Sequence, residues 1–463
     1  MPDERGRPSP PGLRWLGQAL GAVPHGNAEG ERIGYVLVPS ASRPQMLVSP
    51  GERTAAWAAL QRHSDAAPLK VRVAKELMAW ACRAGLAGWI FSSPLPDSSI
   101  GLRTGSCVWP DLIAQIFGRR DLAVAISVGQ VRPQIKPILH VATRAGQVLG
   151  HIKVGWNDVT GSLIRHEAAS LAALASGALA STAAGDAAGG AETAGFLRVP
   201  QVLHHGIWHG RDVLAVSDIG GSRWYRRRRT GLPVPQTWRV GHALGVERGI
   251  LGTSPLWREL SERVERLVGH EALDTPMAAA LARIRDRVES WHASTELDFG
   301  LMHGDWAPWN MASIGSSLAV WDWERSRMRG PVGFDGLFFR FQVDLWIRLL
   351  PPEQALARTL RRLPETMAAS GTAPEAGPAV LRLVMLEVAL RQLEGVAAGA
   401  PVPARVYQAL SGLLEQAGDE RWRPGGPRTA APPSPATAPP RKEASRPQRT
   451  GQNQSHSPRR SAE

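Results

Sequence analysis

Short apolar runs separated by turn residues dominate the segment from about residue 120 to residue 217 of this 463-residue chain. The runs are rich in Val, Ile, Leu and Ala and span five to seven residues, as strands do. Helical spacing occurs once within the segment, after the third run, over Leu163–Leu174. The pattern therefore predicts five strands, over Leu122–Val128, Pro137–Thr143, Val148–Val154, Gln201–Ile207 and Asp212–Val216.

Beyond Gly220 the apolar positions recur with the spacing of amphipathic helices. Two short apolar runs interrupt this pattern, Leu297–Met302 and Leu318–Trp321, and they favour strands. The second half of the chain is thus expected to be mainly helical, which makes the whole an α+β protein. The predicted helices are Leu256–Val268, Met277–Trp291, Phe334–Leu350, Glu353–Met367, Ala379–Val396 and Pro403–Ala417.

Three further segments are defined by composition. Residues 1–30 and 419–463 are rich in Pro and poor in periodic apolar positions, so both are expected to be disordered. Residues 31–110 contain short predicted strands at Tyr35–Val38 and Gln45–Val48 and two helix-like stretches at Ala55–Gln61 and Val71–Ala84, but no motif that indicates a function. Ala175–Gly195 consists almost entirely of small residues and is interpreted as a loop insertion.

The net charge of +13 could suit a polyanionic partner, but its distribution weakens that interpretation. Residues 421–463 alone contain nine basic and two acidic side chains, a net charge of +7 in a tail that is not expected to fold. Arginine greatly outnumbers lysine, and with abundant Ala, Gly and Pro this indicates high-GC coding bias. Nucleic acid is therefore not expected as a partner, and a salt-dependent affinity lost with the tail would be needed to support it.

The hydrophobic content of 43% and charged content of 21% are typical of a globular protein. No apolar run approaches the roughly 20 residues of a membrane span, and the first residues have no signal-peptide character. Cys82 and Cys107 are too few for a disulfide framework. We expect a cytoplasmic protein without a membrane partner.

The chemistry is indicated by His303–Asn310, of sequence His-Gly-Asp-Trp-Ala-Pro-Trp-Asn, and by a second aspartate, Asp322, 17 residues after Asp305. Phosphoryl transfer needs a positioned hydroxyl and metal ions that neutralise phosphate charge. Asp305 is therefore the candidate catalytic residue, accepting a hydrogen bond from the acceptor hydroxyl. Asn310 and Asp322 offer the hard oxygen ligands that Mg²⁺ prefers.

A second group of candidates lies in the strand-rich segment and would bind the nucleotide. Lys153 ends the third predicted strand in a chain with five lysines, and its ammonium suits the phosphates of ATP or GTP. Glu167, on the following helix, is its expected partner. Gly129 lies where a turn would cover the phosphates, although no G-x-G-x-x-G motif is present. The backbone around Ser217–Ile219 is the expected connector at the adenine, by position alone.

Several residues allow two interpretations. His303 is expected to support the catalytic loop rather than react, and Asp335 to act as a cap or loop anchor. Glu324 is either a third carboxylate near the metal or, as favoured here, a partner for Arg325 or Arg327. The run Arg226–Arg229 is expected to be a solvated loop, with contact to phosphate or an acidic substrate as the alternative. The tryptophans near the motif either line a substrate face or pack the loop, and they are Trp306, Trp309, Trp321 and Trp323.

The motifs at His303–Asn310 and Trp321–Glu324 resemble those of the aminoglycoside phosphotransferase and choline kinase group of small-molecule kinases. The resemblance implies a two-lobed protein-kinase-like fold, with a β-rich small lobe over residues 111–219 and a helical large lobe over 220–418. Gly304 stands where protein kinases usually have an arginine, and Trp323–Glu324 replaces Phe-Gly. Both departures favour the small-molecule group over protein kinases.

The resemblance implies a phosphotransferase that transfers the γ-phosphate of ATP or GTP, with Mg²⁺, to a hydroxyl of a small molecule. An aminoglycoside, a sugar-like compound and an amino alcohol all stay open as acceptor. A cationic aminoglycoside would require an acidic pocket, and the predicted C-terminal helices contain no dense acidic cluster. The alternative is a catalytically weak, pseudokinase-like module that binds nucleotide and docks a protein partner.

Overall fold

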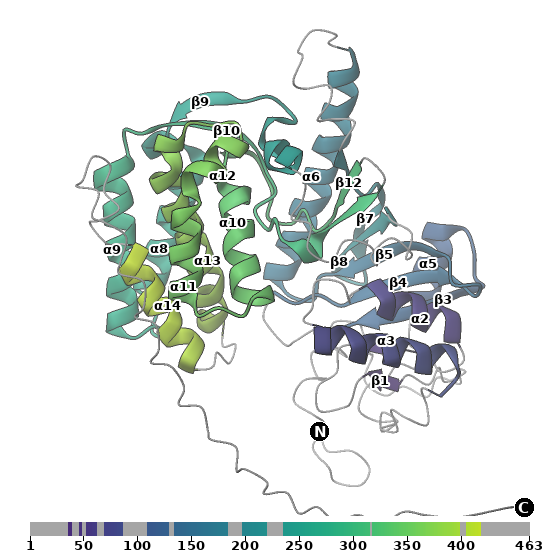
Figure 1. Cartoon of the computed structure of the whole chain (residues 1–463). Helices are drawn as coiled ribbons and strands as arrows, with labels where there is room; N and C mark the ends of the chain where they lie inside the picture. The colour runs from purple at the N-terminus through teal and green to yellow at the C-terminus, as the bar shows by residue number, and fades with distance from the viewer. Residues whose placement is uncertain are drawn as a thin grey trace, which may run out of the picture.

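The computed structural model describes residues 36–38, 46–48, 52–62, 69–86, 109–128, 134–183, 197–219, 235–314, 317–398 and 404–417. The segments predicted to be disordered, 1–30 and 419–463, lie outside these ranges. Figure 1 shows a sheet-rich lobe on one side and a helical lobe on the other, so the expected two-lobed α+β architecture is confirmed. None of the described helices is both long enough and apolar enough to cross a membrane.

Within the described residues, the small lobe contains one antiparallel sheet of seven strands in the order β1-β2-β3-β4-β5-β8-β7. All five strands predicted between residues 120 and 217 are present in it. The long helix α6 follows the third of them, as expected. The strands are β1 Val36–Val38, β2 Met46–Val48, β3 Leu122–Ser127, β4 Ile138–Thr143, β5 Val148–Val154, β7 Val202–Trp208 and β8 Arg211–Ser217.

The alternation along β8 explains how the sheet is covered on both faces. Val213 and Ala215 contribute to the apolar cluster that includes helix α5, Trp109–Phe117. Leu214 and Val216 contribute to the cluster that includes α6, Asp158–Ala183. Because successive side chains of a strand point to opposite faces, a strand buried on both sides has a nearly continuous apolar sequence.

The region 31–110 joins this sheet rather than lying apart from it. Strand β2 pairs with β3 through Met46 and Leu47, and β1 extends the edge. Helices α2, Arg53–Arg62, and α3, Leu69–Arg83, pack on each other and on this end of the sheet (Figure 1). Both short predicted strands and both helix-like stretches of this region are thus confirmed.

Helix α6 differs from the prediction because it continues through Ala183, into the segment interpreted as a loop insertion. Alanine has the highest intrinsic helix propensity, so a run rich in alanine extends a helix that has already started. The loop interpretation is therefore wrong for residues 175–183. The remainder of the predicted insertion, 184–195, lies outside the described residues.

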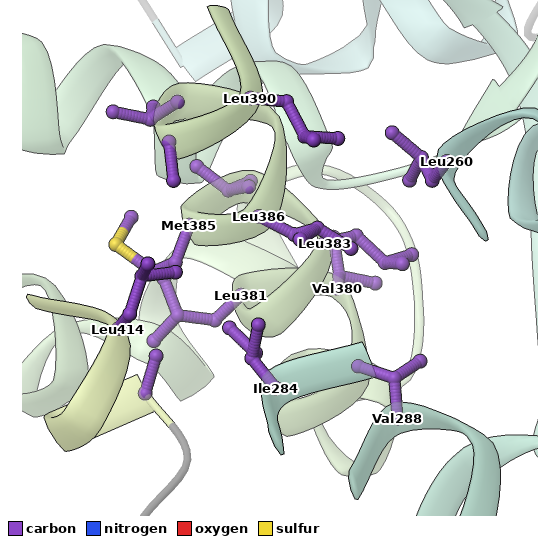
Figure 2. Close-up of a cluster of buried hydrophobic side chains, with 14 of the residues drawn as sticks. Leu260, Ile284, Val288, Val380, Leu381, Leu383, Met385, Leu386, Leu390 and Leu414 are labelled. Atoms are coloured by element: carbon purple, nitrogen blue, oxygen red, sulfur yellow. The ribbon is translucent and has the colours of Figure 1, made fainter. Parts of the chain in front are cut away.

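The large lobe is built around α13, Gly377–Ala397, whose apolar residues occupy every side of the helix. A helix that is apolar all round must be buried in the protein interior. Figure 2 shows its side chains, among them Val380 and Leu383, packing against Leu260 of α8, Ile284 of α9 and Leu414 of α14. The neighbouring helices are α8 Pro255–Val268, α9 Thr275–His292, α10 Phe334–Gln342, α11 Pro352–Arg361, α12 Leu363–Ala369 and α14 Ala404–Ala417.

Two predicted helices are interrupted. Phe334–Leu350 is an α-helix only to Gln342 and continues as a π-turn over Val343–Ile347. Glu353–Met367 is divided at Arg362 into α11 and α12. Pro364 accounts for the second break, since its ring excludes the preceding turn of a continuous helix and it has no N–H to donate.

Two small sheets carry the motif loops. Among the described strands, β10 Glu296–Met302 pairs with β9 Glu247–Ile250 and β13 Arg327–Pro331. The hairpin β11 Met311–Ile314 and β12 Ser317–Val320 adds β6, Leu197–Arg198. Short 3-10 turns complete the lobe, at Pro235–His242, Leu251–Thr253, Pro308–Asn310 and Pro374–Ala376. The loop after β12 thereby reaches the small lobe, where Asp322 contacts Lys153 and Glu324 contacts Lys136, and Figure 1 shows β12 on the side of the large lobe that faces the small lobe.

Candidate active site

The catalytic-loop motif is held by backbone geometry that its residue types explain. Gly304 has a left-handed φ of +77°, and a Cβ at this position would lie 2.3 Å from the carbonyl oxygen of Arg325. Only glycine satisfies both conditions. The Asp335 carboxylate accepts hydrogen bonds from the N–H groups of His303, at 2.7 Å, and Gly304, at 2.9 Å. The expectation of Asp335 as a loop anchor is confirmed.

His303 is fully buried beneath this loop. Its Nδ1 lies 3.1 Å from the N–H of Asp305, which can only donate, so Nδ1 is the acceptor. Its Nε2 therefore carries the proton and donates to the carbonyl oxygen of Trp321, at 3.0 Å. Burial lowers the pKa of His303 and favours this neutral ring. Both ring nitrogens are thus engaged with the backbone of the two motif loops, which suits a supporting role.

Asp305 lies between two partners. Its Oδ2 accepts a hydrogen bond from Nδ2 of Asn310, at 2.7 Å, and its Oδ1 lies 3.3 Å from Nη1 of Arg391. Asn310 also donates to the carbonyl oxygen of Asp305, at 2.9 Å. Burial raises the pKa of Asp305, and Arg391 opposes that shift. The two residues predicted from one motif are therefore in direct contact, with the carboxylate oriented by the amide.

Lys153 joins the two lobes at the centre of the site. Its Nζ lies 2.6 Å from Oε2 of Glu167 and 2.7 Å from Oδ1 of Asp322. Burial by itself lowers the pKa of Lys153, but Asp322 and Glu167 raise it well above its usual range. Glu167 also accepts a hydrogen bond from the N–H of Trp323, at 3.2 Å. The predicted lysine and glutamate of the small lobe are therefore in contact, and both also contact the loop that follows β12, Lys153 through Asp322 and Glu167 through Trp323.

Asp322 has an unusual backbone for an aspartate, with φ of +72°. Burial alone would raise the pKa of its carboxyl group, but Lys153 and Lys136 lower it well below its usual range. Each of Glu167, Asp322 and Glu324 offers one carboxylate oxygen, and these oxygens lie within 4.8 Å of one another. Hard oxygen donors at this spacing fit Mg²⁺.

Glu324 corrects one interpretation made from sequence. Its carboxylate forms an ion pair with Lys136, which precedes β4 in the small lobe, and attracts Arg325 only at longer range, without an ion pair. Arg327 pairs instead with Glu259 of α8. In the sequence the nearest basic residue to Glu324 is Arg325, and only the folded structure shows that Lys136 of the small lobe contacts Glu324.

Lys136 and Arg391 are the site residues that sequence reasoning missed. Lys136 had a usable signal, because lysine is rare in this chain and Lys153 had been singled out for that reason. Arg391, on α13, donates to the carbonyl oxygen of Gly304, at 2.6 Å, and contacts Asp305. No local pattern identifies it, since it is one of many arginines on the predicted helices.

The remaining predictions have mixed outcomes. Gly129 and Arg226–Arg229 lie outside the described residues. Trp306 and Trp323 are fully buried and their rings pack edge-on against His303, so these two tryptophans pack the loop. Trp309 is 36% exposed. At the expected connector, Asp218 lies 3.7 Å from His151 of β5.

No protein-family model matches this chain, and neither does any curated protein. Among solved structures it is similar to a thermostable mutant of aminoglycoside phosphotransferase APH(4)-Ia in complex with AMP-PNP and hygromycin B, with 15% identity, a TM-score of 0.41, and coverage of 69% of this chain and 99% of that chain. ADP-bound aminoglycoside phosphotransferase APH(2'')-Ib has 12% identity and a TM-score of 0.38, and the match covers 68% of this chain and 98% of that chain. A putative fructosamine-3-kinase from Haemophilus somnus 129PT has 13% identity and a TM-score of 0.37, and the match covers 67% of this chain and 96% of that chain. The site of this chain is defined by its own contacts.

Proposed function

We propose that this protein is a phosphotransferase that moves the γ-phosphate of ATP or GTP to a hydroxyl group of a small molecule. One observation carries the proposal. Lys153 and Glu167 from the small lobe meet Asp322 from the large lobe, next to the pair formed by Asp305 and Asn310. A cation for the phosphates, oxygen ligands for a metal and a carboxylate for the hydroxyl are thereby assembled at one junction.

The proposed roles follow from these contacts. Asp305 accepts a hydrogen bond from the acceptor hydroxyl and turns its oxygen toward the γ-phosphorus. That oxygen forms the new bond while the bond from the γ-phosphorus to the bridging oxygen breaks, the nucleoside diphosphate leaves and Asp305 takes the proton late. Asn310 keeps the carboxylate in place through its 2.7 Å hydrogen bond.

Lys153 is the proposed contact to the α- and β-phosphates, held in position by Glu167. Asp322, with the amide oxygen of Asn310, would hold Mg²⁺, and Glu324 is close enough to contribute. Bound Mg²⁺ would neutralise the charge that develops on the phosphates. Because Lys153 contacts Asp322 directly at 2.7 Å, metal and nucleotide binding are expected to rearrange this ion pair.

Asp305→Asn tests the proposal. An amide of the same shape cannot accept the proton, so we expect the rate of nucleoside diphosphate release to fall by about 10²–10⁴-fold. Circular dichroism should show an unchanged fold. The assay is release of ADP or GDP over a panel of sugars, aminoglycosides and amino alcohols. Undiminished transfer by the variant on an accepted compound would show that Asp305 is not the base.

The alternative, a nucleotide-binding module without catalysis, predicts a different response. Its melting temperature should rise with ATP whether or not Mg²⁺ is present, whereas the proposed enzyme needs the metal for full stabilisation. Absence of transfer to every acceptor, together with metal-independent binding, would favour the module.

A further inference from the structure

A cavity of about 560 Å³ lies between the N-terminal part of α6, helices α8 and α13, and the segment that follows Asp322. Arg391 lines it, and the same side chain contacts the carboxylate of Asp305. A molecule in this cavity would therefore contact the arginine that itself contacts the proposed base. It is the natural location for the acceptor, so its lining should indicate the acceptor's chemistry.

The acidic side chains of α8 and α13 in this cavity already have cationic partners. Glu387 lies 2.5 Å from Nη1 of Arg263 and 2.7 Å from Nε of Arg391. Although burial alone would raise the pKa of Glu387, Arg391 and Arg263 lower it to about 2. Arg263 also pairs with Glu394, at 2.6 Å. An incoming ammonium group would have to displace these guanidinium groups to reach a carboxylate.

The other two glutamates of the lining are paired as well. Glu259 accepts hydrogen bonds from both terminal nitrogens of Arg327. Glu324 is paired with Lys136 from the small lobe. The four glutamates of the wall are thus neutralised, and only the exposed Asp158 of α6 has no cationic partner among the described residues. This argues against a polycationic acceptor.

Arg325 differs from the other charged groups of the wall that are not exposed. It is partly buried and lines the cavity, yet among the described residues it forms neither a hydrogen bond nor an ion pair. The carboxylates of Glu324 and Glu387 attract its charge, but Lys136 already pairs with Glu324, and Arg263 and Arg391 pair with Glu387. A partly desolvated guanidinium whose nearest carboxylates already have cationic partners is stabilised when a ligand supplies further negative charge.

We propose that Arg325 binds an anionic group of the acceptor, a carboxylate or a phosphate ester, while the hydroxyl of the same molecule lies at Asp305. The planar guanidinium presents paired donors that suit both anions. This inference rests on the proposed function, because it identifies the cavity with the acceptor subsite.

The test compares acceptors that differ only in the anionic group. Glycerol, glycerate and glycerol phosphate form one series, and glucose, glucuronate and glucose 6-phosphate another. Each is assayed for ADP release and, separately, for binding by calorimetry with Mg²⁺ and AMP-PNP present. Comparing the carboxylate and the phosphate ester within each series, in both assays, shows which anion is preferred.

Arg325→Gln should raise the KM and the Kd of the preferred acidic compound by about 10- to 100-fold, since a lost charge-assisted contact has that effect. The KM for ATP should change by less than about 2-fold, as uniform loss of acceptor binding implies. Arg325→Lys should recover part of the affinity. The matched control is Arg361→Gln, which removes an exposed arginine of α11 that does not line the cavity and should change neither constant.

Three outcomes decide the matter. Equal transfer to neutral and acidic compounds, or equal effects of Arg325→Gln and Arg361→Gln, would overturn this inference and leave the proposed function intact. Arg325-dependent binding of acidic compounds without transfer to any of them would support the subsite and contradict the proposed function. Arg325-dependent preference in both assays supports the two together.

Discussion

Asp322 combines two requirements at one residue. Its carboxylate has to reach Lys153 and the proposed metal position, and its backbone has to turn with φ of +72°. Most residues with a Cβ are strained in this region, but Asp and Asn tolerate it because their short side chains bond locally. A substitution that removes the charge can therefore retain the turn, provided that asparagine is chosen.

Asp322→Asn should consequently keep the fold and lose the metal site. We expect Mg²⁺ to stop increasing the thermal stabilisation given by ADP or AMP-PNP, because a neutral amide binds Mg²⁺ more weakly than a carboxylate does. Differential scanning fluorimetry with and without Mg²⁺ measures this. Full Mg²⁺-dependent stabilisation of the variant would place the metal on other ligands.

At the scale of elements, the large lobe joins three of its helices through a buried histidine. His292, the last residue of α9, lies 2.8 Å from Nη1 of Arg382 on α13, and Arg382 donates to the carbonyl oxygen of Ala417 at the end of α14. Arginine can only donate, so the histidine ring must accept and must be neutral. Burial, helped by Arg382, lowers the pKa of His292 to about 4.

This pKa predicts a stability change below neutral pH. Between about pH 6.5 and 4 the unfolded chain binds a proton at His292 that the folded chain does not, so the free energy of unfolding falls as the pH decreases. The contribution of this group at pH 4.5 is roughly 2–3 kcal/mol. His292→Gln retains an acceptor without titrating and should weaken this pH dependence.

Denaturant unfolding at pH 7 and pH 4.5 measures the effect. The exposed His205 on β7 provides a matched control, since His205→Gln should leave the pH dependence unchanged. The same pH dependence in wild type and His292→Gln would rule out His292 as its source.

At the scale of the whole molecule, the site forms only where the lobes meet. Lys136 and Lys153 of the small lobe pair with Glu324 and Asp322 of the large lobe, and His166 of α6 bonds to the carbonyl oxygen of Ser326 at 2.6 Å. The side chains of Lys136 and Glu324 are only 6% and 14% exposed. Removing one partner of such a pair leaves a buried charge uncompensated.

Lys136→Met should therefore destabilise the protein by about 3 kcal/mol. Adding Glu324→Gln should regain more than half of that loss, because the second change removes the orphaned charge. A double-mutant cycle measured by denaturant unfolding without metal gives the coupling between the lobes. Independent, additive effects of the two substitutions would show that the pair does not connect the lobes.

Residues near one another in sequence were the predictable part of the site. Asp305 and Asn310 are five positions apart and in contact, and a strand-and-helix pattern placed Lys153 and Glu167 in one unit. The same reasoning failed where two local signals conflicted. The small residues after Leu174 suggested a loop, yet their high alanine content extends α6 through Ala183.

By itself the sequence determined which chemical groups exist and in which order, since strands, helices and the spacing of Asp305, Asn310 and Asp322 are local properties of the chain. Only the tertiary structure decided which charges face one another. Lys136 lies 188 residues from Glu324, and Arg391 lies 86 residues from Asp305. Contacts at such separations depend on how the lobes pack, which leaves no periodic trace in the sequence. For the same reason only the folded structure shows that Arg325 lines the cavity without an ion pair to a described residue.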